Sequence, residues 1–469
     1  MAGASLMAAG SGGGAEPGAT FAPAQLVRGS LFFAFAHVVG LAMSLVGSAL
    51  MVRVARQQEV ASYLLFLRAV TVVGLALQLG MASPILRFVP LVRGEGGERG
   101  TRTLRRRVFA VQLAVWAVAL PPLVLLWPAA SWRLGVPELA GAAAAIAALG
   151  ALTSLSRLFG AYLRAFRRYA AAVLEQLLAR GVIAAGLVVL YALGERVSWV
   201  TLAALFSAAL IACALAQAAA VATTTAAETS AAHVAQPAPS VAGIARMSAI
   251  VGTHGLAAAL LVSADLWVLS AVRTHREVAV YGMMLSLLQL VTIGSLAAQF
   301  VVPQEFSRLH ADGRRAELQD LARTSATATL LFGTVAAVAL ALAGRPLISV
   351  LLGPQYVTGW GMLLVLAVGR LWDAASGPAG SLLLMTGHHL RVTLTTLACT
   401  ALSVGLALAL APRWGGYGVA AASSVGLIAV NVVNVRAARR LLGVAAMAHR
   451  SPAAYGRILR RLAAIGRRA

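Results

Sequence analysis

Charged side chains within long apolar segments are the groups in this sequence best placed to do chemistry. Arg68, Arg180 and Arg370 lie inside such segments, and Arg87 stands at the end of one. A charged group in hydrocarbon is costly unless it faces a partner or a water-filled cavity. Because a guanidinium binds phosphate oxygens through two parallel hydrogen bonds, these four arginines are candidate ligands for an anionic substrate.

Each of these arginines also has a structural interpretation. Arg370 and Asp373 are three residues apart, so they could form an ion pair on one helix face. Arg180 could join two helices, Arg68 could extend its head to the membrane surface, and Arg87 could serve as a topology anchor. The residue types leave both interpretations open for all four.

Asp265 is a second kind of candidate, since it lies in an apolar segment with no opposite charge within four residues. Such a carboxyl must be protonated, paired with a group on another helix, or bound to a cation. We therefore treat Asp265 and Asp373 as candidates for ion coupling or as charge partners of the arginines.

Enzymatic constellations are scarce in the polar segments. No pair of carboxylates, zinc-spaced His/Cys cluster or glycine-rich phosphate loop stands where water would reach it. Cys213 and Cys399 both fall inside apolar segments, so they indicate neither a disulfide framework nor a metal site. The sequence therefore predicts no catalytic residue, no metal, no cofactor and a protein that is not an enzyme.

The composition places these residues in a membrane protein. Of the 469 residues, 60% are hydrophobic and 11% are charged, whereas soluble domains carry about 25% charged residues. The net charge of +23 comes entirely from arginines over acids, because the chain contains no lysine. These arginines are scattered between apolar segments, which is typical of topology signals, so no nucleic-acid partner is expected.

Twelve apolar segments are long enough to cross a membrane as helices. We expect an all-α polytopic protein whose twelve helices form two pseudo-symmetric six-helix lobes around a central cleft. The predicted divisions are a disordered cytoplasmic tail at 1–28, an N-terminal lobe at 29–222, a linker at 223–246, a C-terminal lobe at 247–442, and a basic amphipathic cytoplasmic tail at 443–469. The predicted spans are 29–52, 60–84, 107–130, 138–159, 170–193, 198–222, 247–271, 278–302, 324–344, 358–385, 392–411 and 415–435.

An internal duplication supports the two lobes. Glu59–Tyr63 (EVASY) recurs 218 positions later as Glu277–Tyr281 (EVAVY), and each copy follows an apolar run that ends in two arginines. Six spans per half place both halves in the membrane in the same sense, as a parallel repeat. Arginines concentrate in alternate connections, which predicts that both termini are cytoplasmic.

Several further motifs resemble a known family in their order and spacing. They are Gly80–Pro90 (GMASPILRFVP), Ser263–Leu266 (SADL), Leu352–Tyr356 (LGPQY) and Trp414–Ala421 (WGGYGVAA). With the repeated turn, they make nearly all of residues 29–442 similar to the Wzx-type polysaccharide biosynthesis exporters. These are lipid-linked oligosaccharide flippases of the multidrug/oligosaccharidyl-lipid/polysaccharide (MOP) superfamily. Ala61 and Ala279 stand where that family usually has glycine.

The resemblance implies a flippase in the bacterial cytoplasmic (inner) membrane. Such a protein moves a lipid-linked oligosaccharide or polysaccharide precursor from the inner to the outer leaflet by alternating access. Its expected partners are a polyprenyl-pyrophosphate-linked glycan and membrane lipid, and they could extend to a polysaccharide polymerase and glycosyltransferases.

Three alternatives stay open. A cation-coupled multidrug antiporter of the same superfamily would place acidic residues in its cleft, whereas the mid-span positions here favour arginine. A peptidoglycan-precursor flippase typically has fourteen spans. A membrane glycosyltransferase or polymerase would need a sizeable outer loop with catalytic acids or histidines, and the predicted loops are short.

Overall fold

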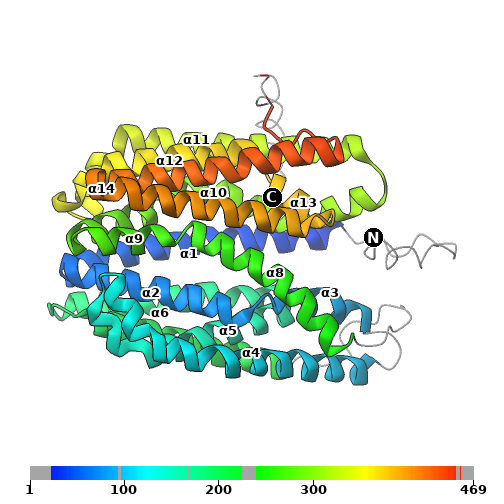
Figure 1. Cartoon of the computed structure of the whole chain (residues 1–469), viewed down its shortest axis with the longest axis horizontal. Coiled ribbons are helices and arrows are strands. Elements are labelled where there is room, and N and C mark those ends of the chain that lie inside the picture. The colour runs from blue at the N-terminus through cyan, green and yellow to red at the C-terminus, as the bar shows by residue number, and fades with distance from the viewer. Residues whose placement is uncertain are drawn as a thin grey trace.

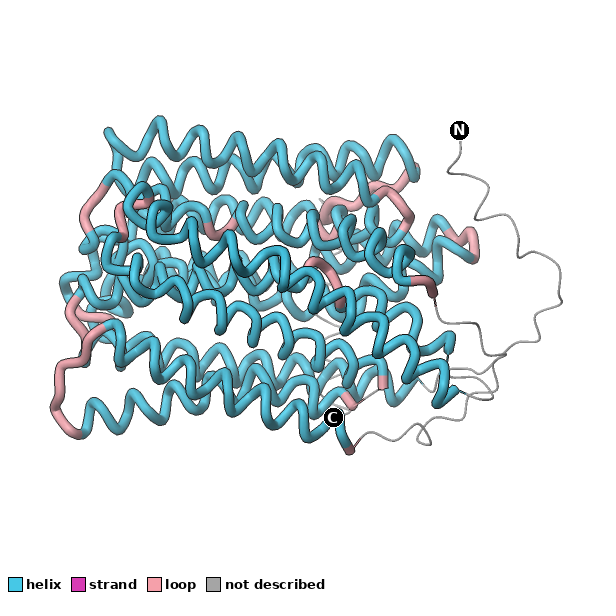
Figure 2. The backbone as a smooth tube through the Cα atoms, turned by 60° about the horizontal axis from the view of Figure 1, so that its bottom comes forward, coloured by secondary structure: helices cyan, strands magenta, loops and turns pink. Residues whose placement is uncertain are grey.

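The computed structural model describes residues 23–92, 97–166, 168–223, 239–449, 451 and 455. Within them every regular element is helical (Figure 2). The predicted N-terminal tail before Pro23, most of the predicted linker and most of the basic C-terminal tail lie outside the described residues.

The N-terminal lobe contains α1 to α7, and the C-terminal lobe contains α8 to α14 (Figure 1). The elements of the first lobe are α1 (Pro23–Val54), α2 (Gln57–Gln78), α3 (Ala82–Val92), α4 (Gly97–Arg133), η1 (Pro137–Ala142), α5 (Ala143–Ala165), α6 (Tyr169–Ala192) and α7 (Trp199–Ala222). Those of the second are α8 (Val241–Leu261), α9 (Ala264–Val272), α10 (His275–Ala311), α11 (Arg315–Leu351), η3 (Pro354–Gly359), α12 (Trp360–Ser376), α13 (Ala379–Met385) and α14 (His389–Leu442).

The twelve predicted spans fit these elements. Among the described residues, 10 helices are long and apolar enough to cross a membrane, and α6 adds the shorter apolar stretch Leu177–Ala192. The helix α14 bends back at Gly415, whose backbone is non-helical. Its two halves run antiparallel, because the Ser403 hydroxyl on the first half donates to the Ala422 carbonyl on the second. Counting these halves separately completes the twelve.

Two of the predicted domain boundaries need correction. The helix α1 begins at Pro23, so residues 23–28 are helical and do not belong to a disordered tail; proline suits the first turn, where no N–H partner exists. At the other terminus, Val444 and Ala446 are buried against the C-terminal lobe. The first residues of the predicted C-terminal tail therefore pack as part of that lobe.

The seventh span is interrupted between α8 and α9, and its first part, α8, contacts both lobes. In Figure 1 α8 runs obliquely between the lobes towards α3 and α4. Near its start, Ile244 packs in the apolar cluster of α3, α4 and α5. Gly80, with a φ of +70°, ends the turn after α2; a Cβ there would lie 2.6 Å from the backbone of Ser248 and Gly252. Only glycine permits this close approach of α8 to the N-terminal lobe.

The two ends of the bundle differ in how the lobes meet. One end of the bundle holds η1 and the first residues of α2 and α10, and we call it the closed end (Figure 1). The opposite end holds the first residues of α1 and the last residues of α14, and we call it the tail end. At the closed end one continuous apolar cluster joins residues of both lobes, Val60 and Leu269 among them. At the tail end α10, α11, α13 and α14 share a cluster around Phe306, and α3, α4 and α5 have a separate cluster around Leu158, which Ile244 of α8 joins. Apolar packing therefore joins the lobes extensively at the closed end, whereas at the tail end α8 makes the apolar contact with the N-terminal lobe.

An arginine-lined cavity as candidate functional site

A cavity of about 450 Å³ lies within the N-terminal lobe, where α9 and α10 of the other lobe close its side. Five helices of the first lobe form its wall: α1, α2, α5, α6 and α7. Three arginines line it, Arg68, Arg157 and Arg180, and no aspartate or glutamate does so among the described residues. The cavity thus concentrates positive charge at a place enclosed by apolar helices.

Two of these arginines, Arg68 and Arg180, were candidates from the sequence, and the structure brings them to one cavity. Arg157 was not among the sequence candidates, although it falls inside the predicted span 138–159. It lies about two turns before the end of α5, within the helix. Its distance from the end of the apolar run was the signal that could have identified it.

Arg180 depends on a glycine of the neighbouring helix. Its guanidinium occupies the space beside Gly40 on α1, so a Cβ at that position would collide with Arg180 Nη1. The charge of Arg180 also acts on His37, one turn away from Gly40 on α1. The packing of α1 against α6 therefore places this guanidinium by leaving room for it.

Arg68 connects the cavity to Asp265. Its Nη1 atom donates to the Ser263 hydroxyl at a distance of 3.5 Å, just before α9 begins. Asp265 itself is buried, with 6% of its surface exposed. The Tyr281 hydroxyl donates to one of its oxygens at 3.1 Å and the Leu266 N–H donates to the other at 2.8 Å. Of the three outcomes expected for this carboxyl, the structure shows a partner on another helix.

Arg370 and Asp373 lie on α12, away from the cavity. The intrahelical ion pair, one of the two interpretations that the sequence left open, does not form between these two described residues. The Asn431 side chain donates to Asp373 at 2.9 Å from the second half of α14, which gives the carboxylate an interhelical partner. The positive charge of Arg370 acts on Asp265, as does that of Arg68. The charges of an arginine from each lobe therefore act on Asp265.

Arg87 lies on α3, near the tail end. Its side chain falls outside the described residues, so its part in substrate binding stays a prediction.

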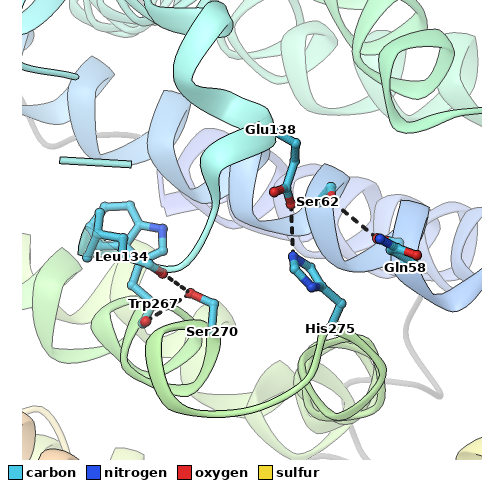
Figure 3. Close-up of polar contacts among 7 residues, drawn as sticks. All are labelled: Gln58, Ser62, Leu134, Glu138, Trp267, Ser270 and His275. Carbon is cyan, nitrogen blue, oxygen red and sulfur yellow. Dashed lines mark hydrogen bonds and ion pairs between the residues drawn. The ribbon is translucent and has the colours of Figure 1, made fainter. Parts of the chain in front are cut away.

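Figure 3 shows polar contacts between the lobes at the closed end. Glu138 of η1 accepts hydrogen bonds from the Ser62 hydroxyl at 2.8 Å and pairs with His275 Nε2 at 2.9 Å. The Ser270 hydroxyl donates to the Leu134 carbonyl at 2.8 Å. The His275 and Ser270 contacts join the C-terminal lobe to the N-terminal lobe. We refer to the Glu138–His275 and Leu134–Ser270 contacts as the interlobe contacts.

Comparison with known proteins identifies solved structures that share this fold. No known family profile and no curated protein matches the chain. Among solved structures, the inward-facing conformation of a multidrug resistance MATE family transporter of the MOP superfamily is 15% identical, with a TM-score of 0.68 over 86% of this chain and 94% of the other. The outward-facing conformation gives a TM-score of 0.65 at 16% identity, over 89% of this chain and 95% of the other.

A third similar structure concerns pocket charge. It is a MOP superfamily transporter from Pyrococcus furiosus whose binding pocket has reversed polarity, which suggests a different function for that protein. It is 16% identical, with a TM-score of 0.65 over 89% of this chain and 95% of the other. At such identities the likeness shows the fold and not the substrate. The chain therefore has the fold of the MATE transporters of the MOP superfamily.

Proposed function

We propose that the protein is an alternating-access transporter of an anionic amphiphile, and specifically a flippase for a lipid-linked glycan precursor. The observation that carries this proposal is the cavity that holds Arg68, Arg157 and Arg180 with no acidic side chain among its described lining residues. Guanidinium groups in a site shielded from bulk water bind phosphate oxygens strongly and with defined geometry.

The size of the cavity suits part of such a substrate. A volume of about 450 Å³ is in the range of sites for small molecules, so it can hold a pyrophosphate with its nearest sugar. A polyprenyl chain would then stay in the bilayer. Because the headgroup is anionic, a potential negative on the donor side would favour its outward movement by about 2.3 kcal/mol per charge per 100 mV.

The asymmetry between the two ends of the bundle supports alternating access. The lobes share one apolar cluster and the interlobe contacts at the closed end. At the tail end the cluster of α10, α11, α13 and α14 is separate from that of α3 to α5, which Ile244 of α8 joins. With both termini in the cytoplasm, as the arginine distribution predicts, this arrangement corresponds to an inward-facing state. The TM-score is also higher for the inward-facing MATE structure than for the outward-facing one.

A second candidate function is a cation-coupled multidrug antiporter. The names of the similar structures support it better than they support a glycolipid flippase, since MATE multidrug transporters share this fold. Asp265 could then bind the coupling ion, with Asp373 as a second carboxylate. The lining of the cavity argues against it, because a cationic drug would face three arginines.

Reconstitution in liposomes separates the two functions. A fluorescent polyprenyl-pyrophosphate disaccharide should become accessible to a membrane-impermeant probe outside, faster with a potential negative on the donor side. Its covalent structure should be unchanged. Movement of a cationic dye coupled to a proton or sodium gradient, without movement of the lipid, would instead establish the antiporter. Elongation or transfer of the glycan would show an enzyme.

The location in the bacterial cytoplasmic membrane and the orientation form a separate proposal. Single cysteines at Gln58 and Arg276 should react with an impermeant reagent added outside intact cells, since both positions are exposed at the closed end. Cysteines at Arg102 and Arg314, exposed at the tail end, should react only after the cells are opened. The opposite labelling pattern would reverse the orientation.

A further inference from the structure

A second basic cavity lies at the tail end of the C-terminal lobe, separate from the arginine-lined cavity. Its volume is about 990 Å³, and it lies between α11, α12 and the second half of α14. Arg323, Arg439 and His449 line it, and no acidic side chain does so among the described residues. We call it the tail-end groove.

One wall of the tail-end groove is formed by the segment that follows α14. Three backbone N–H groups of this segment donate to the lobe, each at 2.9 Å: Ala445 to the Gln319 side chain, Ala448 to the Ala375 carbonyl, and His449 to the Thr327 hydroxyl. Ala446 between them is fully buried. The segment is thus fixed across α11 and α12, and the groove is a built feature of the fold.

The guanidinium of Arg323 indicates that the groove can accept a ligand. Its Nε atom is buried and has no hydrogen-bond partner among the described residues. A buried donor without a partner is costly, so an acceptor brought by a ligand would recover free energy. Arg439, by contrast, is exposed at the mouth of the groove.

The groove is amphipathic along the helix axes. Leu330 lies about two turns deeper on α11 than Arg323, and Val435 lies about one turn deeper on α14 than Arg439. The cationic side chains therefore lie towards the tail end, and apolar side chains continue towards the middle of the helices. A membrane phospholipid has the same order of chemistry, with an anionic phosphate at the surface and acyl chains below it.

We propose that the tail-end groove binds the phosphate headgroup of an anionic phospholipid from the leaflet at the tail end, through Arg323 and Arg439. The lipid is a bound component of the membrane and is distinct from the transported substrate. Arg323 donates to the phosphate inside the groove, and Arg439 contacts it at the mouth. The proposal does not depend on the substrate of the transporter.

Lipid binding to purified, delipidated protein tests this directly. Phosphatidylglycerol should bind in preference to phosphatidylcholine, as measured by native mass spectrometry of the full chain. Arg323→Gln together with Arg439→Gln should weaken phosphatidylglycerol binding by roughly tenfold or more, the effect of losing two cationic contacts at a membrane surface. Arg439→Gln alone should weaken phosphatidylglycerol binding by a smaller factor. Because Arg439 is exposed, this substitution should leave the fold intact.

Arg440→Gln is the matched control. Arg440 is the next residue on the same helix, is exposed, and does not line the groove, so the net charge changes equally while the groove is preserved. An equal loss in Arg440→Gln, or no preference for phosphatidylglycerol in the unaltered protein, would overturn the proposal. Excess inorganic phosphate distinguishes the source of the anion. If it displaces the lipid, the groove is a site for a soluble anion and the lipid assignment is wrong.

Discussion

The second membrane span of each lobe, α2 in one and α10 in the other, begins with the same turn, and the glutamate of that turn makes the same contact in both. Glu59 accepts a hydrogen bond from the Trp199 N–H at 2.7 Å, at the first residue of α7. Glu277 accepts one from the Gly416 N–H at 2.6 Å, where the second half of α14 begins. In both lobes a carboxylate thus neutralises the N-terminus of the last helix. The repeated sequence turn therefore makes equivalent glutamate contacts in the two lobes.

The same comparison shows where the lobes differ. At 218 positions after Arg68, Arg157 and Arg180, the C-terminal lobe has Ser286, Ala375 and Ala398. The repeated helices keep the scaffold, but the charge of the cavity belongs to one copy. The difference teaches that the scaffold and the lining of the cavity are independent features, which substitutions can separate.

The largest expected effect comes from removing the charge of the cavity. Arg180→Gln should slow transport of a pyrophosphate-linked substrate by roughly 10- to 100-fold, because hydrogen bonds to charged groups contribute about 1.5–3 kcal/mol. Initial rates in proteoliposomes measure this. Arg370→Gln should have a smaller effect, since Arg370 lies outside the cavity and acts on Asp265.

Arg345→Gln provides the control for charge alone. Arg345 is exposed on α11, where its guanidinium carbon lies 4.4 Å from the centre of the Trp360 ring. Its substitution should leave transport within about twofold of the unaltered protein. Equal rates for Arg180→Gln and Arg345→Gln would show that the cavity does not bind the anionic headgroup.

An intermediate effect is expected from the repeated glutamates. Glu59→Ala and Glu277→Ala should each lower the free energy of unfolding by about 1–2 kcal/mol, because each leaves a helix N-terminus without its acceptor. Thermal unfolding in detergent checks this. The two losses should be similar in size, and Gln at either position should recover part of each. A loss at only one position would mean that the two contacts are not equivalent.

The smallest effect is expected from the interlobe contacts. The His275–Glu138 pair is partly exposed, with 28% of each side chain accessible, and such a pair contributes about 0–1 kcal/mol. His275→Ala should therefore raise the population that is open at the closed end by up to about fivefold. Spin labels at Arg133→Cys and Arg276→Cys, on opposite lobes, would report the longer distance.

Arg314→Ala is the comparison for this variant. Arg314 and Glu317 form an exposed ion pair on the C-terminal lobe at the tail end, and the pair does not cross between the lobes. Its removal should leave the label distances unchanged. A change of the same size in both variants would indicate a general loss of packing, and the interlobe contacts would then have no special role in closing that end.

The sequence predicted the helices well because their signal is local. Apolar runs of sufficient length must form helices in a membrane, since every backbone polar group has to be paired within the segment. The candidate site was less predictable. Arg68 and Arg180 could be found from their depth in a span, whereas Arg157 is only two residues from the end of the predicted span 138–159 and was not a candidate.

By itself, the sequence determined that the chain is helical, crosses the membrane repeatedly and consists of two copies of one unit. Composition, segment length and the repeated turn contain this information directly. Only the tertiary structure decided that Arg370 lies apart from Arg180, that Asp373 binds Asn431, and that Asp265 meets Tyr281. The direction in which a side chain points depends on how helices rotate and pack against each other. That rotation is set by contacts between residues distant in sequence, such as Gly40 with Arg180.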